Sequence, residues 1–131
     1  MKPKILLVDD DALIHQLYGP HLERAGYQVV GARDGEQAVE LANKELPQVV
    51  IMDLIMNKVD GLEAVLALRR ARSTKAIPVI LISADAQFYG CERQFAEIGA
   101  QGFLSKPFSP MRLLGEVRRV DTEADRPLIE V

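Results

Sequence analysis

The stretch Val49-Val50-Ile51-Met52-Asp53 decides the fold, because four apolar residues in a row end at a single acid. Two further runs of four apolar residues likewise end at a polar residue, at Asp9 and at Ser83. Short continuous apolar runs are typical of strands that are buried on both faces of a parallel sheet. The two further runs are Ile5-Leu6-Leu7-Val8 and Val79-Ile80-Leu81-Ile82.

Segments with helical spacing separate the strand candidates, which also include residues 27–30 and 102–104. In the first segment Leu13, Leu17 and Leu22 recur every four or five residues, and Pro20 is expected to kink or split that helix. The apolar residues that mark the other helices are Ala38, Leu41, Ala42, Leu62, Val65, Leu66, Leu68, Phe95, Ile98, Met111, Leu113, Leu114 and Val117. Asp34 is suited to cap one of these helices, and Ser109-Pro110 opens the last.

Five strand–helix units follow from this alternation. Such units with right-handed crossovers predict one α/β domain, a doubly wound five-stranded parallel sheet with helices on both faces. A length of 131 residues fits one domain. We assign residues 1–120 to this domain and residues 121–131 to a polar tail or the start of a linker.

Composition narrows the classes of function. Apolar residues make up 48% of the chain and charged residues 27%, which is typical of a soluble globular protein. A net charge of -3 disfavours direct binding to nucleic acid. The single cysteine, Cys91, forms no internal disulfide, and no apolar run is long enough to span a membrane. A cytoplasmic location is therefore expected.

Polar residues stand where the predicted strands end. Asp9 and Asp10 follow the first strand, Asp53 the third, Ser83 the fourth and Lys106 the fifth. Because the carboxyl ends of parallel strands share one edge, these groups should converge there. Neighbouring carboxylates repel one another unless a cation lies between them, and Mg²⁺ prefers such oxygen ligands. An acid, a hydroxyl and an ammonium beside a metal suit phosphoryl transfer to a carboxylate.

These strand-end residues belong to longer motifs, which are Val8-Asp9-Asp10, Met52-Asp53-Leu54-Ile55-Met56, Asp60-Gly61, Ile82-Ser83-Ala84 and Gly99-Ala100-Gln101-Gly102-Phe103-Leu104-Ser105-Lys106-Pro107-Phe108. In their order and spacing the motifs resemble the receiver domain of response regulators in two-component signalling. The resemblance covers residues 4 to about 119. It implies a flavodoxin-like fold with the strand order 2-1-3-4-5.

The resemblance also implies roles for single residues. Asp53 would be the phosphoacceptor. Mg²⁺ would be held directly by Asp10, Asp53 and the backbone carbonyl of Ile55, and through water by Asp9. Ser83 would bond the phosphoryl group and move toward it. Lys106 would pair with the phosphoryl oxygens. The bond before Pro107 would be cis, and Phe103 would be an aromatic switch.

The implied protein is a signalling switch and not an enzyme, apart from phosphorylating and dephosphorylating itself. Its phosphodonor would be the phosphohistidine of a sensor kinase or of a phosphotransfer protein. A downstream output domain or protein would read the phosphorylated state. The surface of the last two helices and fifth strand would serve such partners or a homodimer.

Some positions depart from the family pattern or allow a structural interpretation. Asn57 stands where the family often has proline, and Ile55 and Asp85 leave the lifetime of the aspartyl phosphate open. Phe88 and Tyr89 fit partner binding or core packing equally well. We expect two further residues, His15 and His21, to be exposed helix residues without a metal-binding or acid–base role.

Three other functions compete with a phosphorylated switch. A receiver-like interaction module without phosphate cycling would have no need for the complete set of acids. An aspartate-nucleophile phosphatase would carry a second Asp two residues after the nucleophile, where this chain has Ile55. A flavodoxin-like electron carrier would need a Ser/Thr/Gly-rich phosphate loop after the first strand, where this chain has three acids.

Overall fold

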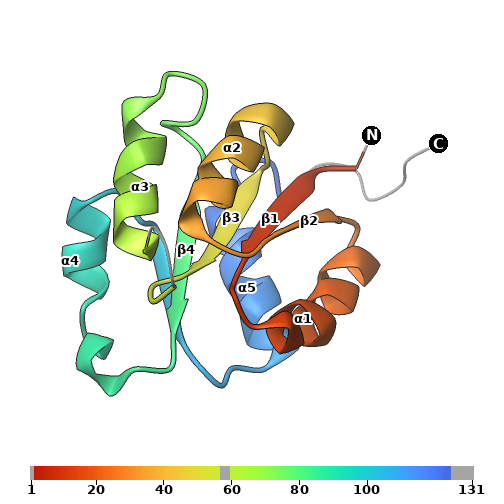
Figure 1. The fold of residues 1–131 in the computed structure, drawn as a ribbon. Helices are drawn as coiled ribbons and strands as arrows, with labels where there is room; N and C mark the ends of the chain where they lie inside the picture. Colours follow the sequence, from red (N-terminus) through yellow and green to blue (C-terminus); the bar gives the residue numbers. More distant parts are fainter. Residues whose placement is uncertain (1, 57–59, 125–131) are drawn as a thin grey trace.

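The computed structural model describes residues 2–56 and 60–124, in which strands and helices alternate (Figure 1). Asn57 and residues 125–131, on which two expectations fall, lie outside the described residues. The strands are β1 Lys4–Val8, β2 Gln28–Ala32, β3 Val49–Asp53, β4 Val79–Ser83 and β5 Gly102–Ser105. The helices are α1 Ala12–Arg24, α2 Gly35–Glu45, α3 Gly61–Arg70, the 3₁₀ turn η1 Ala86–Phe88, α4 Glu92–Glu97 and α5 Pro110–Val120.

The five strands form one parallel sheet in the order β2-β1-β3-β4-β5. This order confirms the predicted doubly wound fold. The register sets Val8 beside Met52, Asp53 beside Ile82 and Ser83 beside Ser105. The carboxyl ends of β1, β3, β4 and β5 therefore meet along one edge of the sheet.

Alternate residues of each central strand point into two separate cores. In β1, Leu6 and Val8 pack under α2 and α3, whereas Ile5 and Leu7 pack under α1 and α5. Figure 1 shows α2, α3 and α4 on one side of the sheet and α1 and α5 on the other. Burial on both faces explains why these strands are continuous apolar runs.

Helix α1 differs from the sequence-based expectation in two ways. Its buried residues are Ile14, Tyr18 and Leu22, while Leu13 and Leu17 are 53% and 50% exposed. Leu22 is buried as expected, but the buried face continues through Ile14 and through Tyr18, which stacks on Phe108, and not through Leu13 and Leu17. The helix is also not split at Pro20, since α1 runs on to Arg24.

The continuity of α1 has a simple physical basis. A proline removes the hydrogen-bond donor for the carbonyl four residues earlier, which here belongs to Gln16. Gln16 and Pro20 are both exposed, so water can satisfy that carbonyl. The helix therefore tolerates the proline.

Capping side chains position the helices that follow the strands. Asp34, Asp60 and Ser109 accept hydrogen bonds from backbone N–H groups in the first turns of α2, α3 and α5. Gly61 allows α3 to begin directly beside β3, because a Cβ at this position would lie 2.5 Å from the carbonyl oxygen of Asp53. The N-terminus of α3 is thus seated against the end of β3.

At the opposite edge of the sheet, Arg69 ties α3 to two loops. Its guanidinium donates to the carbonyl of Gly99 at 2.6 and 2.9 Å, and to the carbonyls of Thr74 and Lys75 at 3.3 and 3.2 Å. It also reaches Gln101 Oε1, which accepts from the first N–H of β4. These bonds join the C-terminal end of α3 to the loop that precedes β5.

The C-terminal boundary of the folded part lies just beyond α5. Asp121 is buried and accepts a 2.8 Å hydrogen bond from the hydroxyl of Tyr27. Asp121 therefore packs with the domain, while the assignment of the later residues to a tail or linker stays a prediction. Within the described ranges, no helix combines the length and apolar character that crossing a bilayer demands.

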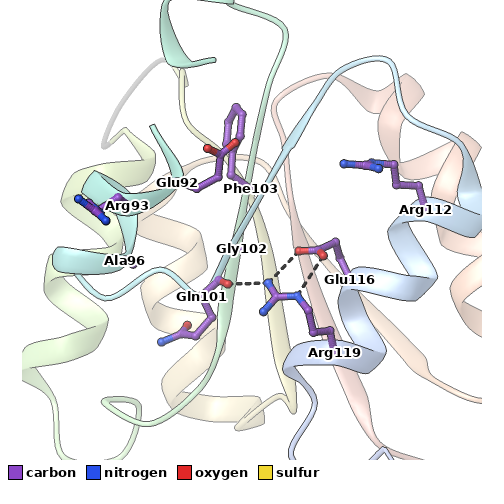
Figure 2. Close-up of a pocket in the computed structure, with 9 residues that line it drawn as sticks. All are labelled: Glu92, Arg93, Ala96, Gln101, Gly102, Phe103, Arg112, Glu116 and Arg119. Carbon is purple, nitrogen blue, oxygen red and sulfur yellow. Dashed lines mark hydrogen bonds and ion pairs between the residues drawn. The ribbon is translucent and has the colours of Figure 1, made fainter. Parts of the chain in front are cut away.

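A polar groove of about 490 Å³ lies between α4 and α5, over the outer edge of β5 (Figure 2). On its floor Arg119 donates to the carbonyl of Gln101 at 2.7 Å and pairs with Glu116 at 2.9 Å. Gly102 leaves room for this pair, since a Cβ there would lie 2.8 Å from Glu116 Oε2. Arg93 and Arg112 line the two sides of the groove.

Candidate functional site

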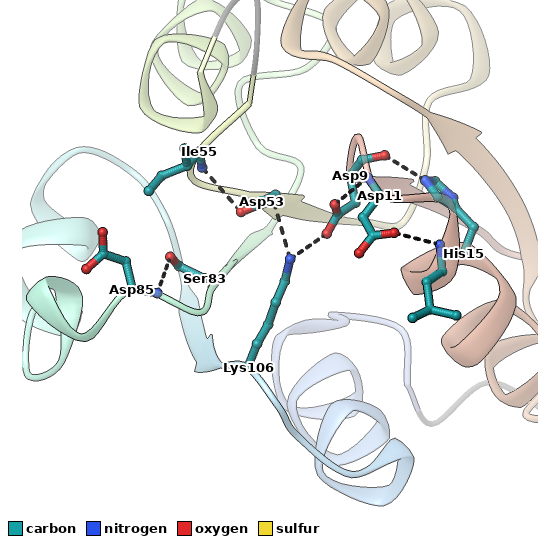
Figure 3. A network of polar contacts seen from close by, with 9 residues as sticks. Asp9, Asp11, His15, Asp53, Ile55, Ser83, Asp85 and Lys106 are labelled. Carbon is teal, nitrogen blue, oxygen red and sulfur yellow. Dashed lines mark hydrogen bonds and ion pairs between the residues drawn. The ribbon is translucent and has the colours of Figure 1, made fainter.

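The strand ends bring together the polar side chains that the sequence placed there (Figure 3). Asp9 follows β1, Asp53 and Ser83 are the last residues of β3 and β4, and Lys106 follows β5. Asp9, Asp53 and Ser83 are buried, although all three side chains are polar. Burial of polar groups at a single edge indicates a functional site, because it opposes stability unless every group finds a partner.

Lys106 is the centre of this network. Its ammonium lies 2.8 Å from Asp9 Oδ2 and 3.3 Å from Asp53 Oδ2. Burial lowers the pKa of Lys106, but the hydrogen bond to Asp9 and the charges of Asp53 and Asp9 outweigh this effect and raise it above its usual value. The backbone N–H of Lys106 donates to the carbonyl of Ser83, and the bond to Pro107 is cis. Lys106 is thus a permanent cation at a fixed place.

The ionised form of Asp53 remains disfavoured despite this cation. Burial and the charge of Asp9 raise the pKa of Asp53 above its usual value, and Lys106 and the N–H of Ile55 offset only part of the rise. The N–H of Ile55 donates to Asp53 Oδ1 at 3.2 Å. The side chain of Ile55 is exposed beside the site. A further cation would therefore favour the ionised form of Asp53.

Asp10 completes an acidic cluster that fits such a cation. Carboxylate oxygens of Asp9, Asp10 and Asp53 all lie within 4.8 Å of one another, and Asp10 is the exposed member. Octahedral ligands about 2.1 Å from Mg²⁺ stand about 3 to 4 Å apart, so small movements would bring these oxygens into range. Hard oxygen donors and an excess of negative charge match Mg²⁺ in both ligand type and charge.

Ser83 and Phe103 link the site to α4. The Ser83 hydroxyl accepts a hydrogen bond from the N–H of Asp85 at 3.1 Å, and Asp85 in turn caps η1. Phe103, in β5, is buried and packs on Phe95 of α4 with the ring centres 5.4 Å apart. A change at Ser83 can therefore reach the segment from η1 to α4 through directly bonded neighbours.

The two aromatics that the sequence left open take different places. Phe88 is half-buried and its ring lies 5.9 Å from that of Phe95, so Phe88 extends the core. Tyr89 is 58% exposed. Partner binding by Tyr89 stays a prediction.

The expected exposure of the two histidines of α1 was wrong, because His15 and His21 are both half-buried. The Nε2 of His15 lies 2.9 Å from the backbone carbonyl oxygen of Asp9, inside the network of Figure 3. A helical pattern shows which side of α1 carries His15 but not that the chain before the helix folds back beneath it. The sequence holds one signal of this contact, the small residue Gly31 on β2, which leaves space for the His15 ring. This signal can be interpreted only once the packing of α1 on β2 is known.

Fold and site together define a class of protein. It is an α/β domain with a doubly wound parallel sheet and, at the edge where the strands end (the carboxyl edge), an acidic cluster suited to bind a cation. The family model of the response regulator receiver domain matches residues 5–118, and the chain belongs to this family. Receiver domains are signalling switches rather than classical enzymes, and they bind Mg²⁺ at their acidic pocket.

Curated relatives are longer than this chain. The DNA-binding dual master transcriptional regulator RpaA of Synechocystis is 38% identical over 124 residues, which cover 95% of this chain and 51% of RpaA. The alkaline phosphatase synthesis transcriptional regulatory protein PhoP of Bacillus subtilis is 34% identical, over 92% of this chain and 49% of PhoP. The chain thus spans about half the length of these relatives.

Solved structures show the same fold. The chemotaxis response regulator CheY4 of Vibrio cholerae is 34% identical with a TM-score of 0.82, and the match covers 92% of this chain and 99% of CheY4. The receiver domain of the sensor histidine kinase PA1611 of Pseudomonas aeruginosa PAO1 is 28% identical with a TM-score of 0.80, over 91% of this chain and 97% of that domain. That structure is described with a magnesium ion coordinated in its active-site cleft.

Proposed function

We propose that the chain is a phosphoryl-accepting switch in which Asp53 receives the phosphoryl group at a site that takes Mg²⁺. The observation that carries this proposal is the position of the Lys106 ammonium between the buried carboxylates of Asp9 and Asp53, within an acidic cluster that lacks a second compensating cation among the residues described. Phosphoryl transfer needs this combination of an anionic nucleophile and fixed positive charge.

The proposed transfer step uses the residues at the site. A carboxylate oxygen of Asp53 attacks the phosphorus of a phosphohistidine, a P–O bond forms, and the P–N bond breaks. The imidazole leaves with the electron pair and takes up a proton. Lys106, whose ammonium lies 3.3 Å from Asp53 Oδ2, would pair with the incoming phosphoryl oxygens. When bound, Mg²⁺ would offset the charge on the phosphoryl group and on its ligands, for which we propose Asp10, Asp53, the Ile55 carbonyl and, through water, Asp9.

The switch uses the link from Ser83 to α4. A phosphoryl group adds a charge of about -1.5 to -2 and several strong acceptor oxygens beside Ser83. The Ser83 hydroxyl then donates to a phosphoryl oxygen, which draws the chain around Asp85 toward the site and changes the space available to Phe103. Phosphorylation would thereby shift the surface of α4, β5 and α5.

Two kinds of partner fit this scheme. The donor would be the phosphohistidine of a sensor kinase or phosphotransfer protein, and Leu13 and Leu17, which are exposed four residues apart on α1, would be suited to contact it. The groove between α4 and α5 would meet a downstream output domain or protein, or a second copy of the chain.

Chemical phosphorylation tests the proposal. Purified chain is incubated with acetyl phosphate and Mg²⁺, or with a phosphorylated histidine phosphotransfer domain, and modification is followed by intact mass and peptide mapping. One phosphoryl group on Asp53 is expected, and Asp53→Asn should abolish it. Asp60→Asn is the matched control, because asparagine keeps the cap of α3. Labelling of Asp53→Asn at wild-type stoichiometry would refute the assignment, and an unlabelled wild type would favour an interaction module without phosphate cycling.

A further inference from the structure

We infer that His15 is a positioning residue for the metal site, an inference that rests on the proposed function and assigns a further residue to it. The ring is held on one side by the Asp9 carbonyl, 2.9 Å from Nε2. Since a carbonyl oxygen only accepts hydrogen bonds, Nε2 carries the proton in this contact. His15 stands six residues after Asp9 and reaches back over the turn that connects β1 to α1.

Asp9 is fixed at every polar atom. Its N–H donates to the carbonyl of Ala32 at 3.1 Å, and its Oδ1 accepts from the N–H of Asp11 at 2.9 Å. Its Oδ2 accepts a hydrogen bond from the Lys106 ammonium, and its carbonyl oxygen accepts one from His15. Ala32 of β2, Asp11 of the following loop and Lys106 after β5 supply three of these partners, and His15 supplies the fourth from α1.

The bond to the Asp9 carbonyl bears directly on Asp10. A peptide unit is planar, so the direction of the Asp9 carbonyl sets the direction of the Asp10 N–H and of the chain that carries its side chain. Asp10 is exposed and is the member of the acidic cluster least confined by packing. By holding the peptide unit before it, His15 restricts where the Asp10 carboxylate can lie.

Gly31 of β2 lies beside the ring and leaves space for it. A Cβ at Gly31 would lie 3.5 Å from His15 Cε1, an ordinary contact, and 3.3 Å from Nδ1, which is tight enough that the ring would have to give by a few tenths of an ångström. Its backbone shows no positive φ, so an alanine there would act mainly by pressing on the ring. The absence of a side chain at Gly31 thus leaves the ring in place, with Nε2 turned toward Asp9.

An NMR titration with MgCl₂ tests this role on the intact chain. The imidazole ¹⁵N shifts should first show the proton on Nε2. The amide shifts of residues 9–11 and 53 then give the Mg²⁺ dissociation constant. His15→Ala should raise that constant about threefold to tenfold, the effect of one lost hydrogen bond. His15→Gln, whose N–H donor stands the same number of bonds from the backbone, should restore most of the affinity. His21→Ala, on the same helix, is the matched control and should leave it unchanged.

A double-mutant cycle with Gly31 separates positioning from a general effect on folding. Gly31→Ala should raise the Mg²⁺ dissociation constant about twofold to threefold when His15 is present and have no effect in a His15→Ala background. Equal effects in both backgrounds, or an unchanged constant for both His15→Ala and Gly31→Ala in a wild type that binds Mg²⁺, would overturn the inference alone. A wild type that shows no Mg²⁺-dependent shifts would overturn the proposed function together with it.

Discussion

The two edges of the sheet hold their polar groups in opposite ways. At the edge where the strands begin, the cation of Arg69 meets neutral acceptors, the carbonyls of Gly99, Thr74 and Lys75. At the edge where the strands end, the cation of Lys106 meets carboxylates that outnumber it. The first arrangement satisfies each group and locks the loops, while the second leaves a surplus of negative charge.

This difference separates stability from function within one small domain. A guanidinium shared among carbonyls has no titrating partner, so its contribution to stability should vary little with pH or metal. A cluster of three acids around one ammonium is most stable when a proton or a cation is added. The carboxyl edge therefore responds to ligands. The edge where the strands begin (the amino edge) holds the loops and helices in place behind it.

The largest effect expected at the carboxyl edge is the loss of magnesium from Asp10→Ala. Removing a proposed direct ligand should weaken Mg²⁺ binding about a hundredfold, or ~2.7 kcal/mol. The matched control is Asp11→Asn, which removes one charge from the same loop but keeps the cap of α1. Mg²⁺ titrations followed by NMR compare the two. If both variants lost affinity equally, Asp10 would act only through its charge and would not be a ligand.

The amino edge should show the reverse pattern. Arg69→Met leaves several partly buried carbonyls without a donor and should lower the free energy of unfolding by about 2 kcal/mol. Mg²⁺ affinity should stay within about twofold of wild type. Arg70→Met, at the exposed neighbouring position, should change stability by less than about 0.5 kcal/mol. Urea unfolding monitored by circular dichroism measures both. A large loss of Mg²⁺ affinity in Arg69→Met would show that the two edges are not independent.

The sequence predicted most of the fold because both signals, the continuous apolar runs and the polar residues at which they end, are local. Continuous apolar runs reported burial on both faces, and the strand ends lay within one residue of Asp9, Asp53 and Ser83. It failed on α1, where the hydrophobic side of the helix includes Tyr18. An aromatic with a hydroxyl is ambiguous in a hydrophobicity pattern, and its burial depends on Phe108, ninety residues away, whose carbonyl accepts its hydroxyl at 2.6 Å.

The site was predictable to the extent that parallel strands converge. Their common direction implied that Asp9, Asp53, Ser83 and Lys106 share an edge, and the structure brings them together. Contacts to backbone atoms were not predictable in this way. The hydrogen bonds of His15 to the Asp9 carbonyl and of Arg69 to the Gly99 carbonyl depend on how a helix packs on the sheet. A pattern of side chains does not indicate where a backbone carbonyl will lie.

The smallest expected effect concerns the stability of the metal-free protein. Because the pKa of Asp53 is raised in the folded state by burial and by Asp9, the native chain binds more protons than the unfolded chain at pH values above the usual Asp range. Stability should therefore fall as pH rises from about 4 through that raised pKa. Asp53→Asn removes this loss and should raise Tm by a few degrees at neutral pH in EDTA, the size of about 1 kcal/mol in a domain of this length. Near pH 4 the gain should vanish, and saturating Mg²⁺ should reverse it by stabilising only the wild type. Thermal melts across this pH range measure the difference. An Asp53→Asn variant that is less stable than wild type at neutral pH without metal would show that the Lys106 pair outweighs burial and the Asp9 charge, and that the carboxyl edge is as fully satisfied as the amino edge.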